Sequence, residues 1–172
     1  MSSLNKSSFF QILLSYFPTL ILFLSVFNEF DFNYLEIEHF SFNFAHILIF
    51  YWTLRNPNFL SYIAIFFAGL INDVVIGIPL GISSLCYLII CTVTAYLRNI
   101  TLSPNFIKDW LSLLFTILFI NSIQILILDL IYLYKVDYVK YLINSGFTFI
   151  FFPLFFFIFD YLNQKILIQQ YD

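Results

Sequence analysis

Long apolar runs, separated by few charges, decide which class of fold this chain can adopt. Apolar residues make up 62% of its 172 residues and charged residues only 10%, whereas charged residues are about a quarter of an average soluble domain. A helix needs about 20 apolar residues to cross a bilayer. The sequence therefore predicts one all-α domain over residues 1–172, a polytopic bundle of about six transmembrane helices at 9–27, 40–54, 59–76, 82–97, 110–134 and 141–162.

The segment 40–54 is the weakest of the six predicted spans. It is short and contains His46, and a span in this region could begin earlier, around Leu35, or lie tilted in the bilayer. A histidine in such a segment is more often a hydrogen-bonded structural residue than a ligand. We therefore expect His46 to be a hydrogen-bonded part of the bundle.

The basic residues predict how the chain crosses the membrane, because Lys and Arg favour the cytoplasmic side. With a cytoplasmic N-terminus, most of them fall on that side (Lys6, Arg55, Arg98, Lys108 and Lys165) and only two fall outside (Lys135 and Lys140). This bias predicts an even number of spans with both termini in the cytoplasm. Trp52 and Trp110 then lie near the cytoplasmic boundary, where indoles favour the headgroup region.

One stretch within the apolar sequence, FAGLINDVVIGIPLGISS, has the composition of a tight turn. Pro79 disfavours a continuous helix. We therefore expect the preceding helix to end near Ile76, with Gly77 as the residue past its C-terminus. The next helix then begins within a few residues, and Ser83 or Ser84 is its expected cap.

Asp73 lies about one turn before the end of the first of these helices. This is the electronegative end of the helix dipole, where an unpaired carboxylate is unfavourable, while the free N–H groups of the next helix lie just across the turn. We predict that Asp73 accepts hydrogen bonds from that first turn and locks the hairpin; the alternative is a carboxylate hydrated at the headgroup level. Gly69 and Gly146 are expected to let a neighbouring helix approach closely.

The order of residues in this hairpin carries a resemblance to a known family. An apolar helix with G-L-x-x-D is followed by a short apolar stretch, G-x-P-L-G and another apolar helix; the residues are Gly69, Leu70, Asp73, Gly77, Pro79, Leu80 and Gly81. This arrangement resembles the rod shape-determining protein MreD family of the bacterial inner membrane. The chain length, the helix count and the place of the motif in the third and fourth helices also agree with that family.

The resemblance implies a non-enzymatic scaffold in the complex that elongates the lateral cell wall, with a part in rod cell shape and peptidoglycan synthesis. It implies MreC as a partner, with RodA, a class B penicillin-binding protein and MreB in the wider complex. It also implies a multi-pass location in the bacterial inner (cytoplasmic) membrane. No cofactor is expected.

Polar side chains gather on the segment 110–134. Asn121, Ser122, Gln124 and Asp129 fall within a face about 160° wide at 100° per residue. Such a face should look at protein or at a wet cavity rather than at lipid. Two interpretations stay open: an internal seam of hydrogen bonds between helices, or a docking surface or polar pocket that includes Asn121, Gln124 and Asp129.

Other chemistry finds little support in the residues. No Cys/His spacing suits a metal, Cys86 and Cys91 are expected to be free buried thiols, and the net charge of −3 gives no support for nucleic-acid binding. The lipid bilayer is thus the one non-protein partner that the composition predicts.

Two alternative functions are weighed against the scaffold. One is the substrate-binding membrane subunit of a vitamin importer, which is expected to dock through small residues on its first helix; here that helix has no Ala or Gly and contains Pro18. The other is an intramembrane aspartyl hydrolase with Asp73 and Asp129 as acid and base. The sequence has no Asp-Arg pair of the kind expected beside the acids of a lipoprotein signal peptidase.

Overall fold

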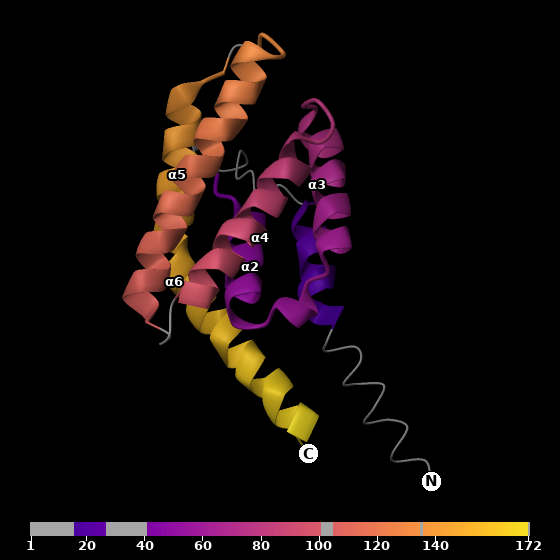
Figure 1. Cartoon of the computed structure of the whole chain (residues 1–172), viewed down its shortest axis with the longest axis vertical. Coiled ribbons are helices and arrows are strands. Elements are labelled where there is room, and N and C mark those ends of the chain that lie inside the picture. Colours follow the sequence, from indigo (N-terminus) through magenta and orange to yellow (C-terminus); the bar gives the residue numbers. More distant parts are fainter. Residues whose placement is uncertain (1–15, 27–40, 101–104, 135, 172) are drawn as a thin grey trace.

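A computed structural model of the chain describes residues 16–26, 41–100, 105–134 and 136–171, and these residues form an all-helical bundle (Figure 1). The described part contains no strand. Its elements in chain order are a helix at Tyr16–Val26, α2 (Phe44–Arg55), the short 3-10 turn η2 (Pro57–Phe59), α3 (Tyr62–Ile76), α4 (Ile82–Ile100), α5 (Phe106–Leu130) and α6 (Tyr138–Tyr171). The predicted all-α fold is confirmed.

Successive helices run in alternate directions, so the bundle has two distinct ends. The α3–α4 turn and the α5–α6 connection lie together at the top of Figure 1, which we call the hairpin end. The α2–α3 connection and the last turns of α6 lie at the opposite end, which we call the basic end because it holds most of the described basic residues: Arg55, Arg98, Lys108 and Lys165. Lys140 is at the hairpin end, and Lys6 and Lys135 lie outside the described residues. This distribution is the one that the charge pattern predicts for a chain whose helices alternate in direction. Which end faces the cytoplasm stays a prediction.

Counted over the described residues, three helices have the length and composition of full membrane spans. They are α4, α5 and α6 as far as Lys165, within the part of the chain that the structure describes. The helix Tyr16–Val26 and α3 are apolar but shorter. At 1.5 Å per residue the 12 residues of α2 reach about 18 Å, less than the ~30 Å hydrocarbon layer. The short α2 agrees with the weakness of segment 40–54 in the sequence, and the number of predicted segments that cross the membrane stays a prediction.

The short helix α2 forms the centre of the bundle. All residues from Ala45 to Thr53 are buried, and α2 packs mainly against α4 and α6. A helix that is enclosed on every side shows no apolar stripe, so the mixed pattern that made segment 40–54 look weak reflects its central position. Trp52 is only 1% exposed and packs edge-on against Phe59, so its ring lies inside the protein; its depth relative to the headgroups stays a prediction.

Side-chain caps explain where two helices begin. The side chain of Asn105 accepts a hydrogen bond from the N–H of Ile107 at 3.0 Å, and α5 therefore begins earlier than the predicted residue 110. The Asp137 carboxylate accepts hydrogen bonds from the N–H groups of Val139 at 3.0 Å and Lys140 at 3.3 Å, which fixes the start of α6. At their other ends α5 stops at Leu130 and α6 continues to Tyr171, beyond the predicted residue 162.

Pro153 lies inside α6, and a tryptophan from α5 compensates for the hydrogen bond that it removes. Proline has no N–H, so the carbonyl of Phe149, four residues earlier, lacks its helical donor. The indole Nε1 of Trp110 donates to this carbonyl at 3.0 Å, and its ring stacks on the Phe149 ring at a centroid distance of 4.7 Å. Trp110 therefore joins α5 to α6, and its predicted position near the membrane boundary stays a prediction.

The Trp110 contact can be tested with a double-mutant cycle. Replacing Trp110→Phe leaves the Phe149 carbonyl without a donor and should lower the free energy of unfolding by about 1–3 kcal/mol. In the Pro153→Ala background a backbone N–H is restored at position 153, so the same replacement should cost clearly less. The measurement is unfolding by denaturing detergent in micelles. An equal cost in both backgrounds would contradict the proposed compensation.

Candidate functional site

The turn between α3 and α4 has the backbone that the sequence predicts. α3 ends at Ile76, and Gly77 follows it in the left-handed region at φ 76°. The carbonyl of Asp73 accepts hydrogen bonds from the N–H groups of Gly77 at 2.9 Å and Ile78 at 3.1 Å, which closes the helix end. Gly81, just before α4, has φ 101°, a value that favours glycine. The chain thus reverses within five residues, 77–81.

The side chain of Asp73 spans this turn and caps α4. Its Oδ2 accepts a hydrogen bond from the N–H of Gly81 at 2.6 Å, and its Oδ1 accepts one from the N–H of Ser83 at 2.8 Å. Asp73 is fully buried. Gly81 has no side chain with which to cap the helix that it precedes, so a carboxylate from α3 takes that role. The prediction that Asp73 accepts hydrogen bonds from the first turn of the next helix is confirmed, and we call this pair of bonds the Asp73 clamp.

The two serines do not cap α4, which corrects the sequence prediction. Ser83 and Ser84 lie inside the first turn of the helix, and both bind α3. The hydroxyl of Ser83 accepts a hydrogen bond from the Asn72 amide at 2.9 Å, and the hydroxyl of Ser84 donates to the carbonyl of Phe66 at 2.9 Å. Because Asp73 already caps α4, the side chains of Ser83 and Ser84 are available to form hydrogen bonds with α3.

Gly69 lets α3 and α4 touch backbone to backbone. A Cβ at position 69 would lie 2.4 Å from the Cα and 2.6 Å from the N of Ser84, which is too close for any side chain. The predicted close approach at Gly69 is therefore confirmed. The same prediction for Gly146 was wrong, since a Cβ there would meet nothing within 4 Å.

The other motif residues divide between the inside and the outside of the hairpin. Pro79 and Leu70 are partly buried, whereas Leu80 at the tip is 67% exposed. In the last turn of α3, Val74 is 69% and Val75 is 43% exposed. The hairpin is thus rigid on its inner side and apolar on its outer side.

The polar face of α5 is not a single surface. The Asn121 amide donates to the hydroxyl of Ser145 at 2.7 Å, and the Gln124 amide donates to the hydroxyl of Tyr141 at 3.4 Å. Both residues therefore join α5 to α6, as the internal-seam interpretation predicts. Ser122 and Asp129 are exposed instead, so the structure does not bring Asp129 together with Asn121 and Gln124.

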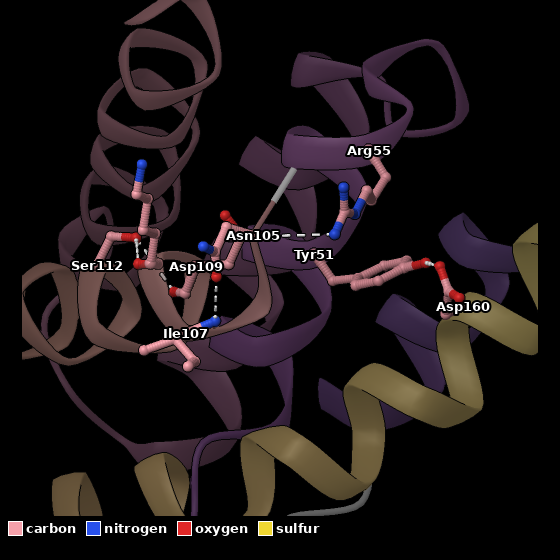
Figure 2. A network of polar contacts seen from close by, with 8 residues as sticks. Tyr51, Arg55, Asn105, Ile107, Asp109, Ser112 and Asp160 are labelled. Carbon is pink, nitrogen blue, oxygen red and sulfur yellow. Dashed lines mark hydrogen bonds and ion pairs between the residues drawn. The ribbon is translucent and has the colours of Figure 1, made fainter. Parts of the chain in front are cut away.

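A polar network at the basic end was not predicted from the sequence (Figure 2). Arg55 at the end of α2 forms an ion pair with Asp109 in the first turn of α5, with Nη2 to Oδ2 at 3.2 Å, and its guanidinium lies over the Phe156 ring at 5.3 Å. The hydroxyl of Tyr51 donates to Asp160 at 3.3 Å. The available signal was that Arg55 and Asp109 both lie near the same predicted membrane boundary. That signal gives their depth but not which helices are neighbours.

The clamp predicts different stabilities for two aspartate variants. Replacing Asp73→Ala leaves the Gly81 and Ser83 N–H groups buried without an acceptor and should lower the free energy of unfolding by about 2–4 kcal/mol. The matched control Asp129→Ala removes an exposed carboxylate from α5 and should change stability by less than about 0.5 kcal/mol. Unfolding in detergent micelles and abundance in the membrane measure both. Equal behaviour of the two variants would contradict the clamp.

The glycines give a second matched pair. Gly69→Ala forces the backbones of α3 and α4 apart and should destabilise the bundle by about 1–3 kcal/mol. Gly146→Ala adds a methyl group in open space within α6 and should be neutral or stabilise by up to about 1 kcal/mol. Thermal unfolding in detergent compares them. If Gly146→Ala proved the more damaging, the close contact at Gly69 would not be what holds the hairpin.

The structure thus brings the hairpin motif together as one unit and places Asn121 and Gln124 in a separate seam between α5 and α6. It contains no cluster of three or more His, Cys, Asp or Glu side chains suited to a metal, within the residues that it describes. Cys86 and Cys91 are buried free thiols, as expected. Comparison with protein-family models, with curated proteins and with solved structures found no match to this chain.

Proposed function

We propose that this chain is a non-enzymatic membrane scaffold of the bacterial cell-wall elongation complex, with the role in rod shape that its resemblance to the MreD family implies. The observation that supports this proposal is the clamped α3–α4 hairpin. Asp73, Gly69, Gly77 and Gly81 each have a role in the geometry of the turn or in helix contact. These residues hold the backbone of the hairpin in one conformation. A hairpin held in this way suits a protein whose role is to bind other proteins through a fixed surface.

The clamped hairpin presents an apolar surface in a fixed position. Val74, Val75 and Leu80 are exposed on its outer side, and the two hydrogen bonds to Asp73 hold the segment that carries them. A surface that is rigid before binding loses little conformational entropy when a partner docks. In a bilayer such a surface suits an apolar transmembrane helix, and a bitopic protein such as MreC offers one.

The aspartyl hydrolase alternative finds less support in the geometry. A general acid or base must reach the substrate, but both oxygens of Asp73 already accept backbone hydrogen bonds and the residue is fully buried. Asp129, the other candidate acid, is exposed on α5. A scaffold requires no such access to the carboxylate, so the buried position of Asp73 favours the structural role.

Co-purification from the native membrane tests the proposed function. The tagged chain is extracted in mild detergent and its partners are identified by mass spectrometry against a control membrane protein of similar abundance. We expect MreC and wall-synthesis enzymes to be recovered specifically. Recovery of a pair of ATPases in their place would contradict the scaffold and favour an importer.

A pair of matched variants makes this test specific to the hairpin. Leu80 and Leu130 both lie at the hairpin end and are 67% and 69% exposed. Leu80→Asn should lower the recovery of MreC about tenfold, equivalent to about 1.4 kcal/mol, and Leu130→Asn should leave it unchanged. Equal losses from both variants would show that the hairpin tip is not the docking surface.

A further inference from the structure

A cavity of about 260 Å³ opens within the hairpin end of the bundle. Its lining comes from the start of α2, the end of α3, the start of α4 and the start of α6, and includes Ala45, Ile76, Ser83 and Lys140. Binding sites for small molecules begin at about 300 Å³, so the cavity has the size of a small solute. It is separate from the outer face of the hairpin, where Val74 and Leu80 lie.

The cavity exists because α2 is short. Residues 41–43 enter the bundle without helical structure, and α2 begins only at Phe44. The side chains of Ser41 and Asn144 are joined by a hydrogen bond of 2.9 Å, and the N–H of Asn43 donates to the hydroxyl of Thr148 at 2.9 Å. Non-helical backbone at this depth is tolerated where it lines a cavity inside the protein. The non-helical residues 41–43 thus line a space that a longer α2 would occupy.

Two polar groups in the lining have atoms without a partner. His46 is only 5% exposed, and its Nδ1 is buried without a hydrogen bond, although the sequence predicts a hydrogen-bonded structural residue. The Oδ1 of Asn144 is also buried without a donor, because its amide nitrogen is the atom that binds Ser41. A buried polar atom without a partner is unfavourable. A bound molecule that carries hydroxyl or amide groups would satisfy both atoms.

The charges of the lining restrict the ligand further. Among the described residues that line the cavity there is no Asp or Glu, and Lys140 is the one charged side chain. Asp73 is not one of the lining residues; its carboxylate interacts electrostatically with Cys86, and its oxygens bind backbone N–H groups. The remaining polar contacts are hydroxyl and amide groups such as those of Ser83 and Gln124, and Tyr87 and Tyr141 supply aromatic surface. Among the described lining residues, Lys140 therefore favours a neutral or anionic molecule over a cationic one.

We infer that this cavity binds a small neutral or anionic molecule that carries hydroxyl or amide groups on a compact apolar or ring-shaped body. His46 and Asn144 hydrogen-bond to it, and Lys140 attracts it at the rim. This binding site stands independently of the scaffold role, because it uses none of the exposed residues on the outside of the hairpin.

The two cysteines of the chain allow a direct test of access and charge preference. Cys86 lines the cavity, whereas Cys91 does not and serves as the internal control. Anionic sulfonatoethyl methanethiosulfonate and its cationic trimethylammonium analogue are applied to the purified protein, and each rate is divided by that of free mercaptoethanol. Cys86 should react about tenfold faster with the anionic reagent, because a single cation at the rim concentrates anions. Lys140→Glu, a change at an exposed residue, should reverse the preference.

Either of two outcomes would overturn the site as described. Cys86 could prove as unreactive as Cys91, which would mean that the cavity does not admit small solutes. It could instead prefer the cationic reagent in the wild type, which would contradict the charge assignment.

The ligand itself is sought by mass spectrometry of small molecules released when the purified full chain is denatured. Ala45→Trp fills the cavity, and Leu118→Trp makes the same change on α5 at a residue that is 43% exposed. We expect a neutral or anionic hydroxyl- or amide-bearing molecule from the wild type and from Leu118→Trp, reduced at least about tenfold in Ala45→Trp.

Because Ala45→Trp could fail to fold, the anionic Cys86 adduct of the wild type provides a second way to displace the molecule. Release of a cationic compound, or of lipid and detergent alone, would overturn the inference.

Discussion

The hydrogen bonds from the first turn of α4 to the carboxylate of Asp73 hold the rest of the architecture in place. A buried carboxylate at the C-terminal end of α3 is unfavourable alone, and the N–H groups of Gly81 and Ser83 offset that cost. The clamp fixes α4 against α3 closely enough for Gly69 to meet the backbone of Ser84. α4 in turn packs against both α2 and α5, so the position of this one helix sets much of the bundle.

The predictions that succeeded concern local chemistry, and those that failed depend on which helices become neighbours. The turn and the Asp73 hydrogen bonds could be predicted because Gly77, Pro79 and Gly81 restrict the backbone over a few residues. The central place of α2 could not, since an enclosed helix has no periodic pattern to detect. Arg55 and Asp109 are 54 positions apart, and nothing in their own segments shows that α2 ends beside the start of α5.

The two ends of the bundle hold their helices together by different means, and this division suits the proposed roles. The basic end is closed by an ion pair, a tyrosine–aspartate contact and packed aromatic rings. The hairpin end is held by the Asp73 carboxylate and by hydroxyl and amide groups around a cavity, with an apolar outer surface on the hairpin beside it. The proposed docking surface and the proposed solute site therefore both lie at the hairpin end of the molecule.

The burial of α2 also has a consequence for how the chain is made. Ribosomes deliver the N-terminal segments first, but α2 packs mainly against α4 and α6, which are synthesised later. Until α6 emerges, Phe50 and Tyr51 lack the α6 residues Phe152 and Asp160 that they contact, and a 12-residue segment is too short to stand across the bilayer alone. α2 therefore reaches its final packing only after α6 has been made. The middle of this protein is completed last, when the end of the chain arrives.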